Sequence, residues 1–143
     1  MRAALWRHLQ WRGLVLAGVG ACWIWYGVGL IVTDRPGIIA ATGPLLRIMC
    51  IEAWGGVWIA GGLAGVLTAA LRPGRDLPGF AGLTGPLLVW ALSFAVAAVT
   101  GSYETAWTAV PLYLAPLLMV VVIAVLTGGR TRRCACEGVS RGR

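Results

Sequence analysis

The chain has 143 residues, of which 59% are hydrophobic and only 12% are charged, and its formal net charge is +7 at pH 7. Because a soluble domain carries roughly 25% charged residues, this composition excludes an ordinary soluble globular protein. The sequence has a single histidine and shows neither a nucleophile–base pattern nor paired carboxylates. It therefore offers no set of residues for enzymatic catalysis. We therefore expect a membrane protein that is not an enzyme.

Residues 1–12 form a basic arm ahead of the first long apolar stretch. Apolar residues, including Trp6 and Trp11, alternate there with three arginines. Such a pattern is typical of a short amphipathic helix on a membrane surface, with its arginines toward anionic lipid. The alternative is a cluster of positive charge that only sets the orientation of the chain.

Four long apolar stretches follow, and each reaches the roughly 20 residues that a helix needs to cross a bilayer. The expected spans are 13–33, 49–71, 79–101 and 105–128. Because backbone groups in lipid must be satisfied within the segment, each span is expected to be helical. The predicted fold is all-α, with four transmembrane helices packed as an antiparallel bundle over residues 13–129.

Arginines are distributed unevenly between the two sides of such a bundle. Ten of the twelve fall on the side of the termini, and only Arg35 and Arg47 fall on the other. Since basic residues favour the cytoplasmic side, both termini are predicted to be cytoplasmic. The chain would then be a multi-pass membrane protein, with the connections 34–48 and 101–104 on the side away from the cytoplasm.

The second span carries small residues at the spacing that lets two helices approach closely. In lipid, helices gain little by hiding large apolar side chains, so small residues drive their association. We expect these positions to pack against neighbouring helices of the same chain, with association between copies as the alternative. The positions are Gly56, Ala60, Gly61, Ala64 and Gly65.

Trp23, Trp58 and Trp90 each fall near the middle of a span. Tryptophan in membrane proteins normally collects at the two interfaces instead. We expect each of these rings to face a neighbouring helix, where glycine makes room for it. The alternative is an aromatic-lined ligand site.

Four charged residues are predicted to gather at the outer end of the bundle. They are Arg35, Arg47, Glu52 and Glu104. Glu52 is the one ionisable residue clearly within a span, and such a carboxylate is a functional candidate by default. However, Glu52 is expected near Arg47 and water at the outer end of its span, and the middle of the spans has no polar residues that would continue a path from it. We therefore expect a structural charge cluster rather than a transport path.

Residues 130–143 form a basic tail whose composition is typical of a disordered segment, and its arginines offer a second contact for anionic lipid. Cys134 and Cys136 are two thiols that suit a soft metal ion, but a closed metal site needs about four ligands. We therefore expect neither a metal nor another cofactor.

Several turns and aromatic positions resemble those of small four-span membrane proteins from actinobacterial phages and prophages. The motifs are Trp23-Ile24-x-Tyr26-Gly27, Pro36-Gly37, Trp58-Ile59, Arg72-Pro73-Gly74-Arg75-Asp76, Gly79-Phe80 and Trp90. The resemblance covers roughly residues 11–127 and leaves the tail outside it. These proteins generally have no assigned activity, and some phage membrane proteins of this size are holin-like. The resemblance therefore implies a phage origin and a place in the bacterial cytoplasmic (inner) membrane.

We expect a holin-like protein that self-associates and permeabilises the membrane. Its expected partners are the lipid bilayer and further copies of the chain, and no nucleic acid is expected. One alternative is a small transporter or channel, with Glu52 and the mid-span tryptophans along its path. The other is a non-transporting anchor or accessory subunit that binds a second protein.

Overall fold

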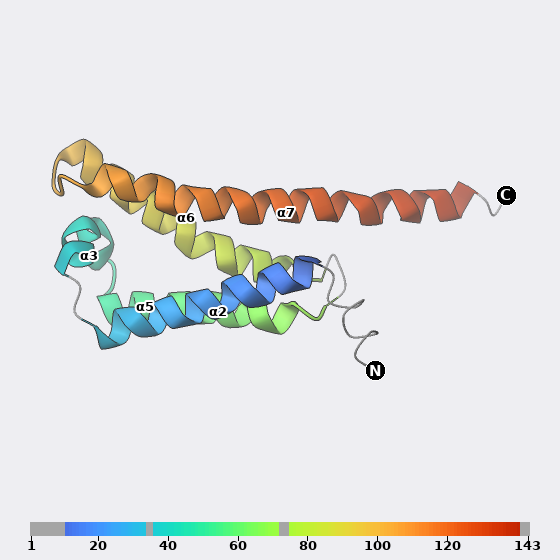
Figure 1. The fold of residues 1–143 in the computed structure, drawn as a ribbon, viewed down its shortest axis with the longest axis horizontal. Coiled ribbons are helices and arrows are strands. Elements are labelled where there is room, and N and C mark those ends of the chain that lie inside the picture. Colours follow the sequence, from blue (N-terminus) through green and yellow to red (C-terminus); the bar gives the residue numbers. More distant parts are fainter. Residues whose placement is uncertain (1–10, 34–35, 72–74, 141–143) are drawn as a thin grey trace.

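A computed structural model describes residues 11–33, 36–71 and 75–140, with side chains for 12–126 of these. All regular secondary structure in the described chain is helical, and the described residues contain no strand (Figure 1). Its six helices are α2 (Trp11–Val32), α3 (Pro36–Ala41), α4 (Gly43–Leu46), α5 (Ile51–Thr68), α6 (Leu77–Thr100) and α7 (Ala106–Ser140).

Four of these helices are long and apolar enough to cross a membrane. The candidate spans are Arg12–Val32, Ile51–Thr68, Leu77–Thr100 and Ala106–Leu126. The ends of these helices lie within three residues of the predicted ends of the spans. The prediction of an all-α fold with four helices long and apolar enough to span a membrane is confirmed, and these helices indicate a multi-pass membrane protein.

The bounds of α6 follow from residues that favour the two ends of a helix. Pro78 lies in the first turn, where its missing N–H removes no intrahelical hydrogen bond. Gly101 ends the helix in the left-handed region, at φ 67°, and its N–H donates to the carbonyl of Ala97. A residue with a side chain is strained in that conformation, so glycine makes a sharp end to the span possible.

Pairs of glycines bring α2 and α5 into backbone contact. A Cβ atom built on Gly20 would lie 2.6 Å from the carbonyl oxygen of Gly62, and one on Gly27 would lie 2.5 Å from that of Gly55. The reverse contacts are as close, since a Cβ on Gly62 would lie 2.5 Å from the oxygen of Gly20. Each helix therefore presents two glycines seven residues apart, and together they allow an approach that no larger residue permits.

A second glycine face of α5 meets α6. A Cβ on Gly61 would collide with the carbonyl oxygen of Gly82, and one on Gly65 would lie 3.1 Å from a methyl carbon of Leu83. A Cβ on Gly65 would also lie 3.1 Å from the carbonyl oxygen of Leu16 in α2. The α5 helix thus lies between α2 and α6, and Gly65 is close to both of them.

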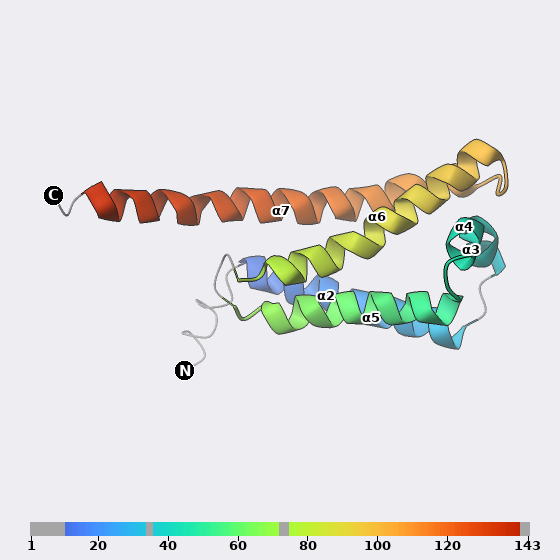
Figure 2. The ribbon, with the colours of Figure 1, turned by 180° about the vertical axis from the view of Figure 1, so that it is seen from behind.

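The α7 helix packs mainly against α6, which crosses between it and the α2–α5 pair (Figures 1 and 2). Among its described side chains only Ala106 and Val120 are buried. The helix continues beyond its apolar part to Ser140, which differs from the predicted disorder of the tail. The tail contains no proline, and its isolated glycines cost a helix only about 1 kcal/mol each, so the helix has no strong stop signal there.

The predicted outer connection 34–48 is largely folded, because α3 and α4 cover one end of the bundle. Ala41 and Thr42 are fully buried there. The indole Nε1 of Trp54 donates to the carbonyl of Leu45 at 3.2 Å, and the hydroxyl of Ser93 donates to that of Ala41 at 3.4 Å. These bonds tie the segment to α5 and α6. We call this end of the molecule the α3 end and the opposite one, where α2 begins, the Arg12 end.

Candidate functional site

An aromatic cluster occupies the centre of the bundle. Trp58 contacts the ring of Trp23 at a centroid distance of 5.1 Å, that of Tyr26 at 4.8 Å and that of Trp90 at 5.5 Å. Trp54 joins from the α3 end, 5.3 Å from Trp90. All four pairs are edge-to-face, the arrangement that the aromatic quadrupole favours. The structure thus brings the three mid-span tryptophans of the sequence analysis together and adds Trp54 and Tyr26.

Only some of these indoles have a conventional hydrogen-bond partner. Trp23 donates to the carbonyl of Leu83 at 3.1 Å. Trp58 and Trp90 are 1% and 0% exposed, and within the described chain the Nε1 atoms of both have no partner. A buried donor without an acceptor costs about 1–3 kcal/mol. The edge-to-face contacts of these rings are each worth about 0.5–1.5 kcal/mol beyond their burial, which offsets part of this cost.

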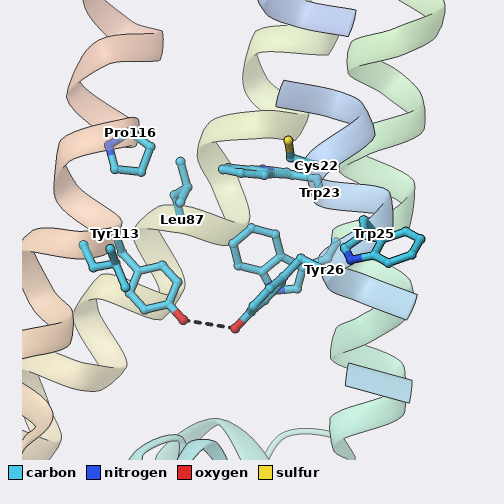
Figure 3. A pocket seen from close by; sticks show the side chains of 9 residues that line it. Cys22, Trp23, Trp25, Tyr26, Leu87, Tyr113 and Pro116 are labelled. Atoms are coloured by element: carbon cyan, nitrogen blue, oxygen red, sulfur yellow. Dashed lines mark hydrogen bonds between the residues drawn. The ribbon is translucent and has the colours of Figure 1, made fainter. Parts of the chain in front are cut away.

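A pocket of about 360 Å³ adjoins this cluster, between α2 and α7 (Figure 3). Its walls are almost entirely apolar or aromatic. They are formed by Cys22, Trp23, Trp25, Tyr26, Trp58, Leu87, Leu112, Tyr113 and Pro116. The hydroxyl groups of Tyr26 and Tyr113 lie 3.0 Å apart in a hydrogen bond that joins α2 to α7 at one edge of the pocket.

No family model, curated protein or solved structure matches this chain. The resemblance to phage membrane proteins therefore stays a prediction.

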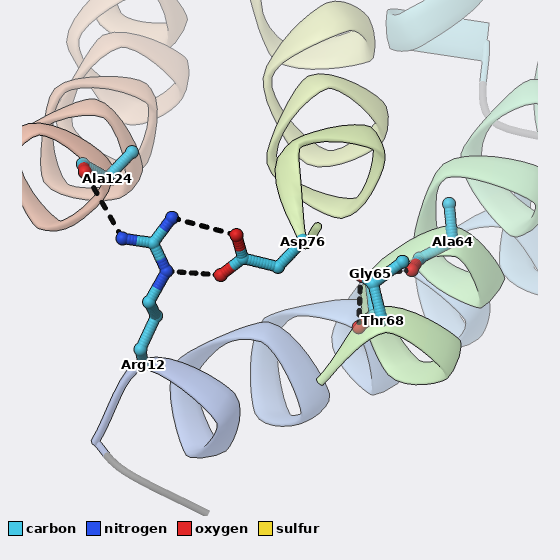
Figure 4. A network of polar contacts seen from close by, with 6 residues as sticks. All are labelled: Arg12, Ala64, Gly65, Thr68, Asp76 and Ala124. Atoms are coloured by element: carbon cyan, nitrogen blue, oxygen red, sulfur yellow. Dashed lines mark hydrogen bonds and ion pairs between the residues drawn. The ribbon is translucent and has the colours of Figure 1, made fainter. Parts of the chain in front are cut away.

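A buried ion pair connects three helices at the Arg12 end (Figure 4). Arg12 donates through Nε and Nη2 to the two carboxylate oxygens of Asp76, with Nη2 at 3.0 Å from Oδ1. Its Nη1 donates to the carbonyl of Ala124 in α7 at 3.3 Å, and the guanidinium lies 4.5 Å from the ring centroid of Phe80 in α6. The two side chains of the pair are 10% and 3% exposed.

The sequence alone did not predict this pair. Arg12 belongs to the predicted basic arm, and Asp76 stands at the end of the Arg72-Pro73-Gly74-Arg75-Asp76 motif. Residues 1–10 of that arm lie outside the described chain. The one signal in the sequence was that Arg12 and Asp76, which have opposite charges, precede two spans that begin on the same side. This signal did not distinguish Arg12 from the other arginines on that side.

The predicted outer charge cluster is not assembled from the residues that the structure describes. Arg47, Glu52 and Glu104 are exposed near the α3 end, and none makes an ion pair with another. Arg35 lies outside the described residues. Exposed ion pairs contribute only about 0–1 kcal/mol, so water competes well for these charges and little favours their association.

The small residues of the second span divide between two environments. Gly61 and Gly65 are buried, and Ala64 is half-buried beside Gly82. Gly56 and Ala60 are exposed, and no neighbouring atom lies within 4 Å of a Cβ built on Gly56. The first set packs within the chain, whereas the second leaves an uncovered face of small residues.

The cysteines do not form a metal site within the described part of the chain. No group of three or more potential ligands lies close together there. Cys22 and Cys50 are free and exposed. Cys134 and Cys136 lie in the part of α7 for which only the backbone is described.

Proposed function

We propose that the chain is a holin-like protein of the bacterial cytoplasmic membrane, whose copies associate and permeabilise that membrane. The observation that carries the proposal is the large uncovered apolar surface of the membrane-spanning helices. Leu112, Leu118 and Leu126 of α7 are between 61% and 70% exposed, although they lie on the most apolar span of the chain. Such surface is available to lipid or to another copy.

The uncovered small residues of α5 favour contact between copies. Ala53, Gly56 and Ala60 are exposed at positions i, i+3 and i+7, so they share one side of the helix. A second helix can approach closely there and gain van der Waals contact that lipid tails do not match. This face is separate from the glycines that hold α5 against α2 and α6.

The walls of the central pocket do not favour a water-filled path through a single copy of the chain. The central pocket has apolar walls, and Glu52 lies in the first turn of α5 at the α3 end. A small transporter or channel formed by one copy is therefore a weaker candidate than a lesion formed between copies. A membrane anchor that binds another protein through the same uncovered faces is the remaining alternative.

The proposed topology is an antiparallel bundle with both termini in the cytoplasm. The α2 and α6 helices both begin at the Arg12 end, where Arg12 meets Asp76. The α7 helix ends on that same side (Figures 1 and 2). The sequence assigns ten arginines to this side and two to the other, and the positive-inside rule then favours the cytoplasm for the Arg12 end.

Inducible expression in a bacterial host tests the proposal, with culture density and a potential-sensitive dye as readouts. We expect abrupt depolarisation and growth arrest after a delay. Gly56→Leu should abolish or strongly delay both, because the added side chain blocks close approach of a second copy. Gly18→Leu is the matched control, since Gly18 of α2 is also exposed and also has open space around it. Sustained growth with an intact potential, at confirmed membrane expression, would contradict the proposal.

Glu52→Gln separates the lesion from the transporter. A lesion between copies should keep its timing and extent, because Glu52 is exposed at the α3 end rather than in a path through the chain. Loss of permeabilisation by this variant, at equal expression, would favour a Glu52-dependent path instead.

A further inference from the structure

The pocket between α2 and α7 lies at the middle of the proposed membrane-spanning region. Its α2 residues, Cys22 to Tyr26, are 10–14 positions from Arg12, which is roughly 15–21 Å along a helix that rises 1.5 Å per residue. The hydrocarbon core is about 30 Å thick. On α7, residues 112–116 fall near the centre of the span Ala106–Leu126.

Contacts between α2 and α7 lie on both sides of the pocket along the helix axes. Toward the α3 end, the hydrogen bond between Tyr26 and Tyr113 crosses from one helix to the other. Toward the Arg12 end, Leu16 and Val120 are buried in one cluster, and Arg12 donates to the carbonyl of Ala124. Contacts between the two helices thus lie between the pocket and each end of the bundle.

The pocket does reach the side of the bundle. Trp25 forms part of its wall and is 82% exposed (Figure 3). At this depth, the medium beside Trp25 is the hydrocarbon of the bilayer. A ligand that enters from there is apolar, as are the walls that it meets.

We propose that this pocket binds the acyl chain of a membrane phospholipid, which enters sideways between α2 and α7. Its volume falls in the range of ordinary ligand sites, about 300–1,000 Å³. Left empty, apolar walls lose the van der Waals contacts that an occupant restores. The indole and phenol rings provide broad contact surfaces, and the Tyr26–Tyr113 bond limits how far the chain reaches toward the α3 end. The site lies within one copy and is independent of the α5 face in the proposed function.

Photolabelling tests the site. The purified chain in detergent is titrated with a phospholipid that carries a diazirine at the middle of one acyl chain, and the labelled residues are mapped by mass spectrometry. We expect saturable labelling within residues 22–26 and 112–116. Labelling of exposed positions elsewhere at a similar depth, such as Leu92 of α6, should rise without saturation. Equal, non-saturating labelling at all exposed positions would overturn the proposal.

Variants that fill the pocket provide the decisive comparison. Cys22→Trp should reduce the saturable labelling several-fold, because Cys22 lines the pocket and is exposed. Ala21→Trp should leave it unchanged, since Ala21 is an exposed neighbour that does not line the pocket. Leu112→Trp fills the pocket from the opposite wall, and it replaces Cys22→Trp in this comparison if that variant does not accumulate in the membrane. The proposal would also be overturned if Ala21→Trp lost as much labelling as Cys22→Trp. Saturable labelling by a photoreactive isoprenoid, but not by the phospholipid, would overturn it as well.

Discussion

At the scale of single residues, the Arg12–Asp76 pair is the interaction whose loss should lower the stability of the fold most. Two opposite charges are buried together at the junction of α2, α6 and α7. A buried pair of this kind adds little net stability compared with apolar residues, because both charges have lost water. Removing one partner is different, since the other is left buried and uncompensated.

We predict that Arg12→Gln and Asp76→Asn each lower the free energy of unfolding by about 3–5 kcal/mol. The double variant should be less destabilised than the sum of the two, because an amide pair carries no uncompensated charge. Thermal unfolding in detergent, followed by circular dichroism, measures all three. Arg75→Gln, which changes an exposed arginine next to Asp76, is the control and should change stability little. Additive losses in the double variant would show that the two side chains do not act as a pair.

At the scale of the helices, glycine decides which helices meet. The α5 helix presents Gly55 and Gly62 to α2, Gly61 to α6 and Gly56 to the outside, and Gly65 lies close to both α2 and α6. Five glycines of one helix thus have different roles. Helix propensity alone would favour alanine at every one of them, so the packed glycines are explained by the close approach that they permit.

We predict opposite effects for two chemically identical substitutions in α5. Gly62→Ala should destabilise the chain by about 1–3 kcal/mol, because its new Cβ meets the backbone of Gly20 and forces the helices apart. Gly56→Ala should be neutral or stabilising by up to about 1 kcal/mol, because its Cβ enters open space. Unfolding in detergent compares them directly. An equal loss in both variants would mean that α2 and α5 do not approach each other at Gly62.

At the scale of the whole molecule, the helices form a glycine-packed unit of α2, α5 and α6, with α7 laid along α6 (Figure 1). The Arg12 end is held by an ion pair and the α3 end by two short helices. Between them, α2 and α7 are joined at the tyrosine pair and near Arg12, and the pocket lies between these two contacts.

We predict that the two ends of this molecule face opposite sides of the membrane. In a chain whose native cysteines are replaced, Arg47→Cys should react with a membrane-impermeant maleimide in intact cells, and Arg75→Cys should not. Both positions are exposed, so accessibility within the chain does not separate them. After the cells are permeabilised, both should react. The reverse pattern in intact cells would place the termini outside.

The sequence by itself determined the number, the helical nature and the approximate bounds of the four candidate membrane spans. These properties are local: about 20 apolar residues cross the hydrocarbon, and backbone groups in lipid require a helix. The ends of α6 were equally local, since Pro78 and Gly101 act on their own backbone. The central tryptophans could be singled out for the same reason, from their position along each span.

Only the tertiary structure decided which residues meet. Gly20 and Gly62, Arg12 and Asp76, and the tyrosine pair each come from helices far apart in the sequence. Their meeting depends on how each helix is rotated about its axis. In a soluble helix, an apolar stripe reveals that rotation. These spans are apolar on every side, because both lipid and protein interior accept apolar residues. The pattern of hydrophobicity therefore could not separate Gly62 from Gly56, or locate the pocket between α2 and α7.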